Sequence, residues 1–280
     1  MRSAKGLCAG ELDWEQRWRE MAGARARERA RSDPWEKRAK RFARLADEGR
    51  QEWLFDVLGP LLRSGDRVLE IGAGTGRHVP ELARRTQWVH AFEPSAAMRA
   101  ELEAAVAAAR LSNVQVSPEA WPPATGVVRA DVAFSCHVLY GVEDAAAFLV
   151  AMTESARRLC ALVLAPRPPM TALADLELAI RAEARPRAPG ALEAFALLWQ
   201  LGLPANLQLL PGSGRALRFR SDGDDLLELC HRLGLGDGPE DQARVRAALI
   251  QTAPEVEPGL YEVGTQGPHA LITWPGTAGD

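Results

Sequence analysis

From Arg67 onward, short apolar runs alternate with longer segments of helical periodicity. Apolar runs of about five residues bounded by turn residues are typical of buried strands. These runs cover residues 67–71, 88–92, 114–116, 131–135 and 160–164. Helices are expected between them, over residues 77–85, 95–110 and 143–158. Strands that alternate with helices in this way predict a parallel sheet with right-handed crossovers.

The flanking regions show different patterns. Residues 11–58 are expected to be helical, with Trp14 and Trp18 on one face and a helix start at Ser32-Asp33-Pro34. After the proline-rich turn at 166–169, helices are expected over 173–184, 191–201, 221–233 and 239–251. Further extended segments are expected over 206–210, 217–220, 261–263 and 270–274.

Composition and charge narrow the class of protein. The 280 residues carry a net charge of −3, so the chain as a whole has no general attraction for nucleic acid. The four cysteines, at 8, 136, 160 and 230, form no Cys-x-x-Cys pair, which argues against a zinc site or a disulfide framework and favours a reducing cytoplasm. Neither a signal peptide nor a membrane span is expected, and no metal ligand set is predicted.

The most informative motif is the glycine-rich turn after the first strand of the predicted sheet. Gly72, Gly74 and Gly76 alternate with Ala73 and Thr75, and Arg77 stands where a dinucleotide fingerprint has its third glycine. An acid, Glu70, precedes the glycines. A carboxylate there would repel a pyrophosphate but would attract a ligand that carries a sulfonium and an ammonium group.

A second acid ends the next strand. Glu93 follows Gly76 by 17 residues, where a carboxylate can accept hydrogen bonds from both ribose hydroxyls of an adenosyl group. Pro94 and Met98 follow it and are candidates to line the adenine. The pattern therefore predicts an adenosyl ligand at the carboxyl ends of the strands.

These motifs together resemble class I S-adenosylmethionine (SAM) dependent methyltransferases. Val68–Gly76 is similar to their motif I, and Ala91–Ser95 resembles their acidic second motif. Ser117–Ala120 resembles the segment after strand three, and Asp131–Leu139 resembles the strand-four motif. The resemblance covers roughly residues 60 to 165, with the four motifs in order.

The resemblance implies an α/β fold with a doubly wound, mostly parallel seven-stranded sheet and an antiparallel last strand. It implies an N-terminal helical cap over residues 1–60, a SAM-binding core over 61–165, and a region over 166–280 that completes the sheet and carries helical insertions. These insertions are expected to form an acceptor-side or oligomer surface. SAM is the implied cofactor, and S-adenosylhomocysteine (SAH) is the implied product.

The implied site residues fall into two groups. His137 and Tyr140 are the catalytic candidates. His137 follows strand four, has a near-neutral reference pKa and is placed to act as a base. Tyr140 can orient an acceptor. The alternative, which we favour for each residue, is a positional or packing role beside the cofactor. The cofactor-binding candidates are Glu70, Gly72, Ala73, Gly74, Gly76, Glu93, Pro94, Met98, Glu119, Ala120 and Cys136.

Two departures from the family pattern limit these assignments. The third motif reads Pro118-Glu119-Ala120 where the family usually has Gly-Asp-Ala, which puts the adenine contact of Glu119 in doubt. The strand-four motif has no Asn-Pro-Pro-Tyr, so the resemblance does not imply an amino-methylating nucleic-acid enzyme of that kind.

Several alternatives stay open at this point. A small-molecule acceptor is expected, and an RNA or protein acceptor, a catalytically silent binding protein and a nicotinamide oxidoreductase rank behind it. The aromatic side chains of the N-terminal helices either pack these helices on the sheet, which we favour, or cover the cofactor pocket. These residues are Trp14, Trp18, Trp35, Phe42 and Trp53. The Arg-rich stretch at 25–44 is interleaved with acids, which favours a solvated helix face over an RNA-binding patch. The oligomeric state is not predicted.

Overall fold

The computed structural model describes residues 12–29, 39, 43, 52–166, 173–181, 187–210, 216–265 and 267–277. The contacts divide the chain into two compact units. The first contains the residues up to Leu164, Pro189–Leu210 and the chain from Ala270 onward. The second contains Ala165–Ala188 and Pro211–His269. The three functional regions expected from the sequence, 1–60, 61–165 and 166–280, stay a prediction.

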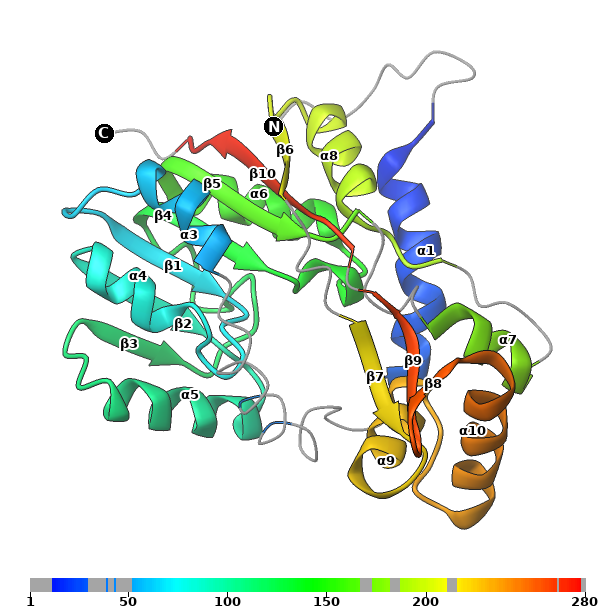
Figure 1. The fold of residues 1–280 in the computed structure, drawn as a ribbon. Coiled ribbons are helices and arrows are strands. Elements are labelled where there is room, and N and C mark those ends of the chain that lie inside the picture. Colours follow the sequence, from blue (N-terminus) through cyan, green and yellow to red (C-terminus); the bar gives the residue numbers. More distant parts are fainter. Residues whose placement is uncertain are drawn as a thin grey trace. The chain divides into compact units, whose positions relative to one another are not determined.

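The first unit is built on a seven-stranded sheet with the strand order β3-β2-β1-β4-β5-β10-β6 (Figure 1). β1 pairs in parallel with β2 and β4, β2 pairs with β3, and β4 pairs with β5. β10 runs antiparallel to β5, so the predicted fold class is confirmed. The strands are β1 (Arg67–Ile71), β2 (Trp88–Phe92), β3 (Val114–Ser117), β4 (Ala130–Cys136), β5 (Ala156–Leu164), β6 (Asn206–Leu210) and β10 (His269–Pro275).

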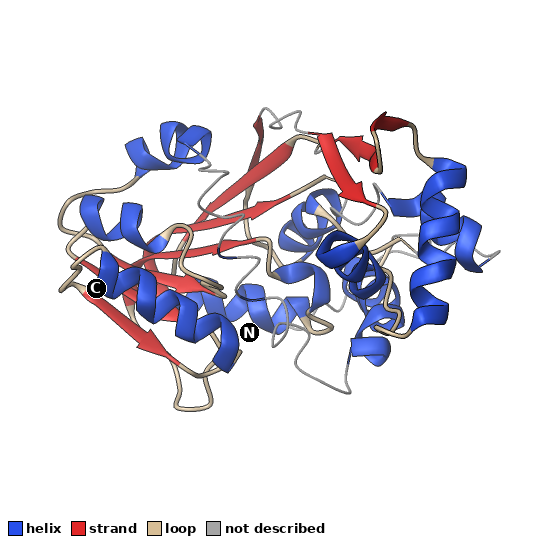
Figure 2. Cartoon of the chain, turned by 60° about the horizontal axis from the view of Figure 1, so that its bottom comes forward, coloured by secondary structure: helices blue, strands red, loops and turns tan. Residues whose placement is uncertain are grey.

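Both faces of this sheet are covered by helices (Figure 2). Successive residues of β5 alternate between two buried clusters: Cys160 and Leu162 join one, and Ala161 and Val163 join the other. This alternation explains the continuous apolar runs, because a strand buried on both faces has no polar side. The helices and short 3-10 turns of this unit are α1 (Trp14–Arg29), α3 (Glu52–Leu58), η1 (Gly59–Leu61), α4 (Val79–Arg85), α5 (Ala96–Ala108), η2 (Leu139–Gly141), α6 (Ala145–Ser155) and α8 (Ala191–Gln200).

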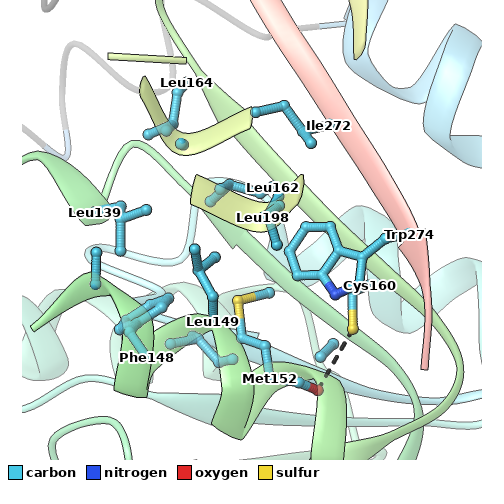
Figure 3. Packing of buried hydrophobic residues seen from close by; sticks show 14 of the residues in the cluster. Leu139, Phe148, Leu149, Met152, Cys160, Leu162, Leu164, Leu198, Ile272 and Trp274 are labelled. Carbon is cyan, nitrogen blue, oxygen red and sulfur yellow. Dashed lines mark hydrogen bonds between the residues drawn. The ribbon is translucent and has the colours of Figure 1, made fainter. Parts of the chain in front are cut away.

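The larger cluster packs α6 and α8 against one face of the sheet, where it includes side chains of β5 and β10 (Figure 3). Cys160 is fully buried there, and its thiol donates to the carbonyl of Met152 at 3.4 Å. Burial raises the pKa of this thiol above its ordinary value. Cys160 is therefore a small apolar residue of the buried core.

The N-terminal helix α1 belongs to the same cluster. Trp18 is 1% exposed and packs within it, and Trp14 lies at its edge. For these two tryptophans the packing interpretation is confirmed. The helix start at Ser32-Asp33-Pro34, Trp35, Phe42 and most of the Arg-rich stretch lie outside the described residues, as does the side chain of Trp53.

The second unit has its own core. A three-stranded antiparallel sheet, in the order β7-β9-β8, packs with three helices around Phe219, Leu226, Leu229 and Leu249. Its elements are α7 (Ala174–Arg181), β7 (Ala216–Arg220), α9 (Gly223–Arg232), α10 (Pro239–Thr252), β8 (Glu255–Glu257) and β9 (Leu260–Thr265). Among the described residues, no helix is long and apolar enough to cross a membrane.

Two segments differ in kind from the sequence prediction. Residues 156–158 were expected to end a helix, but they begin β5, because Ala156 pairs with Ala130 of β4. β8 was not expected, since its three residues, Glu255–Glu257, are all exposed and leave no apolar signal. In both segments, pairing with a neighbouring strand decides the local structure.

Candidate cofactor and acceptor site

The glycine-rich turn leaves the sheet at the carboxyl end of β1. The amides of Gly72 and Ala73 donate to the carbonyl of Phe92 on β2, at 2.8 and 3.0 Å. Gly72, Gly74 and Gly76 have φ angles of +73°, +60° and +85°, which lie in the left-handed region that favours glycine. The alternating glycines are thus required by the backbone of the turn.

Glu93 lies directly against this turn. One carboxylate oxygen accepts from the amide of Gly74 at 2.8 Å, and the other accepts from the amide of Ser95 at 2.9 Å. The parallel register, with Ile71 opposite Phe92, places the ends of β1 and β2 side by side. The structure therefore brings Glu93 and the glycine turn together, as the sequence motifs predict.

Glu70 lies on the neighbouring strand and is enclosed by the protein. It is 2% exposed, and its Oε1 is 3.5 Å from Nδ1 of His78, at the start of α4. Burial raises the pKa of Glu70, and the hydrogen bond and charge of His78 oppose this increase. Burial alone would lower the pKa of His78, but Cys136 and Glu70, through hydrogen bonds and charge, raise it to about 9.

His78 was missed by the sequence analysis. It follows Gly76 by two residues and lies outside the motif of glycines and acids that predicts the cofactor site. Its ring also packs edge-on against Phe134 of β4, with 5.6 Å between centroids. Burial of the histidine could not be inferred, because the preceding Arg77 and the following Val79 give no consistent helical pattern.

Two polar atoms of the turn have no hydrogen-bond partner within the described structure. They are Oε2 of Glu70 and Oγ1 of Thr75, and both are fully buried. An unpartnered buried oxygen is unfavourable, so such atoms need a specific explanation. Together with Glu93 they make a turn rich in acceptors, which fits a ligand with ammonium, sulfonium and hydroxyl groups and does not fit a pyrophosphate.

The remaining cofactor candidates gather around the end of β2. Met98 is buried, and its Cε lies 3.6 Å from the position that a Cβ on Gly74 would take. Pro94 is exposed. Ser95 caps α5 by accepting from the amide of Met98. Met98 thus bounds the turn from the side of α5.

The third motif lies beyond β3. Glu119 is half-buried and Ala120 is exposed. One oxygen of Glu119 accepts from the hydroxyl of Thr125 at 3.1 Å. Since Ser117 pairs with Phe92, this segment follows a strand that borders β2 at the same sheet edge. The adenine contact of Glu119 and Ala120 stays a prediction.

His137 and Tyr140 form a pair at the end of β4. The Nδ1 of His137 and the hydroxyl of Tyr140 are 2.8 Å apart, and the two rings are stacked with an interplanar angle of 17°. His137 has a φ of +59°, uncommon for a residue with a side chain, and its amide donates to Val163 at 2.9 Å. Backbone conformations of this kind cluster at functional sites.

The pair lies close to the glycine turn in space, although the two are far apart in the sequence. Glu70 and Ile71 of β1 are paired with Phe134 and Ser135 of β4, so both segments emerge at one edge of the sheet. A Cβ on Gly72 would lie only 2.4 Å from the side chain of Val138, which follows His137. The catalytic candidates and the turn are therefore in one place.

Cys136 differs from Cys160. It is a free, half-buried thiol at the end of β4, and it interacts with His78. The Cys136 thiol is thus only partly enclosed by the core, and its contact with the cofactor stays a prediction. The described residues contain no group of His, Cys, Asp and Glu side chains that could hold a metal.

A hollow lies at the opposite edge of the sheet. It is lined by Arg67, Gln87 and Trp88, at the amino ends of β1 and β2, and measures about 260 Å³. Ligands of open α/β sheets bind outside the carboxyl ends of the strands. The glycine turn, and not this hollow, is the candidate site.

Comparison with known proteins gives one family and several structures. Residues 35–162 match a family described as a methyltransferase domain. The YcgJ protein of Bacillus subtilis is 14% identical, with 82% of this chain and 100% of that chain covered and a TM-score of 0.56. The BH2331 protein of Bacillus halodurans C-125 is 16% identical, with 78% and 95% covered and a TM-score of 0.54.

The magnesium protoporphyrin IX methyltransferase of Synechocystis PCC 6803 with bound SAH is 14% identical. The alignment covers 95% of this chain and 100% of that one, with a TM-score of 0.48. No curated protein matches the sequence. At these identities, the similarity to the first two structures concerns the fold.

Proposed function

We propose that this protein, whose residues 35–162 match a methyltransferase-domain family, is a class I SAM-dependent methyltransferase that transfers the methyl group of SAM to a small-molecule acceptor. The observation that carries the proposal is the glycine turn with a carboxylate on either side. Glu93 contacts the amide of Gly74, and the buried Glu70 keeps an unpartnered oxygen within the same turn.

Different residues at the turn would bind different parts of SAM. Glu70 would hold the positively charged amino-acid end, because a buried carboxylate attracts an ammonium group strongly. Glu93 would accept from the ribose hydroxyls while it keeps its backbone partners, since each carboxylate oxygen has two lone pairs. The remaining surface of the SAM pocket would be lined by Pro94, Met98, Glu119, Ala120 and Cys136.

When bound, SAM supplies a methyl carbon activated by the sulfonium. A lone pair of the acceptor forms the new bond to that carbon, and the carbon–sulfur bond breaks with its electrons going to sulfur, which yields SAH. The protein mainly has to position the acceptor in line. An acceptor that arrives protonated also has to lose a proton.

His137 and Tyr140 would take up that proton or orient the acceptor. Their 2.8 Å contact lets a proton move between Nδ1 and the phenol oxygen. The strained backbone of His137 supports a functional role over simple packing. We favour a small-molecule acceptor because the net charge of −3 gives no general attraction for RNA.

Calorimetric titration with SAM, SAH and NAD tests the proposal. We expect SAM and SAH to bind and NAD to give no heat of binding. Micromolar binding of NAD without binding of SAM would contradict the proposal. If SAM binds but a panel of small molecules and total RNA shows no tritium transfer from labelled SAM, the protein is a binding protein and not a methyltransferase.

A further inference from the structure

We propose that Trp18 of α1 is a positioning residue that holds the His137–Tyr140 pair in place through the segment between β4 and α6. The inference rests on the proposed function, in which this pair serves the acceptor. It extends the site to a helix that lies more than one hundred residues earlier in the chain and that contributes none of the predicted site residues.

The pair needs support from its surroundings. A residue with a side chain is strained in the left-handed region, where His137 has a φ of +59°. Such a conformation persists only where neighbouring contacts fix it. Contacts that fix it include the hydrogen bond from the amide of His137 to the carbonyl of Val163 and the contact of its Nδ1 with the hydroxyl of Tyr140.

The second contact depends on η2, which carries Tyr140. This short turn ends where the amide of Val142 donates to the carbonyl of Leu139, at 3.0 Å. A turn of three residues with one such bond has little stability of its own. Its position must therefore be set by what packs against it.

Trp18 is the residue that packs there from α1. Its indole N–H donates to the carbonyl of Val142 at 2.8 Å, and its ring is 1% exposed. It belongs to the same buried cluster as Leu139, and Tyr140 packs against that cluster. The indole therefore holds the end of η2 by a hydrogen bond to Val142. It also holds the buried side of η2 by packing in the same cluster as Leu139.

The start of α1 is anchored independently. The amide of Trp14 donates to Oε1 of Gln200, at 2.6 Å, and Nε2 of Gln200 donates to Asp13 at 3.0 Å. These bonds tie α1 to the end of α8, which is part of the same unit. With its first turn held by α8, α1 can act as a fixed support for η2.

Nuclear magnetic resonance of the full chain tests this role by measuring the ring signals of His137 and Tyr140. The chain has two tyrosines and five histidines, so Tyr140→Phe and His137→Gln assign the relevant signals after selective labelling. In Trp18→Phe, which keeps a ring but loses the N–H, we expect the ring nitrogen signals of His137 to shift toward those of Tyr140→Phe. The Tyr140 ring signals should shift toward those of His137→Gln.

Trp274→Phe is the matched control. Trp274 is also buried in this cluster, and its indole N–H also donates at 2.8 Å, but to the hydroxyl of Thr153. Its loss should lower the unfolding midpoint to a similar extent and leave the signals of the pair unchanged. Should Trp18→Phe not fold, Gln200→Ala loosens α1 from outside the core and should shift the same signals in the same direction.

The outcomes separate this inference from the proposed function. Unchanged His137 and Tyr140 signals in folded Trp18→Phe, or equal changes in Trp274→Phe, would overturn the role of Trp18. Failure of the unmodified protein to bind SAM in calorimetry would instead contradict the proposed function. That result would leave the structural coupling between Trp18 and the pair measurable.

Discussion

At the scale of single residues, the site is marked by side chains that the fold encloses at a free-energy cost. Glu70 and His78 are both buried, and they share a contact of 3.5 Å. Glu93 is bound by backbone amides, and His137 has an unusual backbone conformation. The two acids and His137 were identified from sequence motifs, but their geometry depends on neighbours that no local pattern reveals.

The buried pair should make stability depend on pH. The pKa of His78 in the folded protein is raised from 6.5 to about 9, so its stabilising contribution is complete below pH 6.5 and is lost as the pH rises through 9. The raised pKa of Glu70 acts in the same direction. We expect the free energy of unfolding to fall by at most about 3 kcal/mol between pH 6.5 and 9.

Urea denaturation at several pH values measures this dependence. His78→Gln removes the ionisable ring, so its stability should decline less steeply over the same interval. The difference between the two proteins isolates the contribution of His78 from those of the other ionisable groups. Parallel curves for the two proteins would show that His78 does not carry the effect.

Glu93 offers a test of the cofactor site. Glu93→Ala should weaken SAM binding by about 1 to 3 kcal/mol, since it leaves ribose hydroxyls without an ionised partner. Calorimetry measures the affinity, and circular dichroism checks that the variant folds. The control is Glu103→Ala, an exposed acid on α5. Equal affinities for Glu93→Ala and the unmodified protein would refute the assignment of Glu93.

At the scale of elements, the turn after β1 and the segment after β4 are packed so closely that neither can change alone. The position of a Cβ on Gly72 lies 2.4 Å from one methyl group of Val138 and 3.1 Å from the other. Val138 directly follows the strained His137. The glycine pattern of the motif thus serves two purposes: it permits left-handed φ angles and it admits a neighbouring segment.

Gly72→Ala should therefore be destabilising by about 2 to 4 kcal/mol, from backbone strain together with overpacking against a branched side chain. Thermal and urea unfolding measure the loss. Gly65→Ala is the matched control, because a Cβ at Gly65 meets nothing within 4 Å and its φ is not in the left-handed region. Similar losses in the two variants would mean that contact with Val138 is not the cause.

Elements with a strong sequence pattern were predicted well. The bounds of β1, β2 and β6 agree with the expected runs, since each is a short run flanked by turn residues. β5 begins four residues earlier than expected, because Ala156–Leu159 includes two arginines that mask its pairing with β4. The fold was therefore more predictable than the site, where His78 and the support from Trp18 arise only from tertiary contacts.

At the scale of the whole molecule, the candidate site and the second core belong to different parts of the chain. Every predicted cofactor and catalytic residue lies in the first unit. The second unit folds around its own cluster, which includes Leu229 and Leu249. The chain thus contains two cores with separate hydrophobic interiors.

Hydrogen exchange with and without SAM should reveal this division. We expect slower exchange at the glycine turn and around residues 91–98 and 134–140, where ligand contacts stabilise the folded state. Amides in the cores of α9 and α10 should exchange at unchanged rates. Adding NAD serves as the control. Protection confined to α9 and α10 would contradict the placement of the cofactor at the turn.

The antiparallel pairing of β10 with β5 has a consequence for engineering. Leu164, where the chain leaves the first unit, is the ladder partner of Ala270, where it returns. Between these two residues the chain forms the second unit, except for Pro189–Leu210, which returns to the first unit and contributes α8 and β6. The first departure and the last return of the chain are therefore held side by side by the β5–β10 pairing, so we expect changes of length within residues 165–188 or 211–268 to leave this pairing in register.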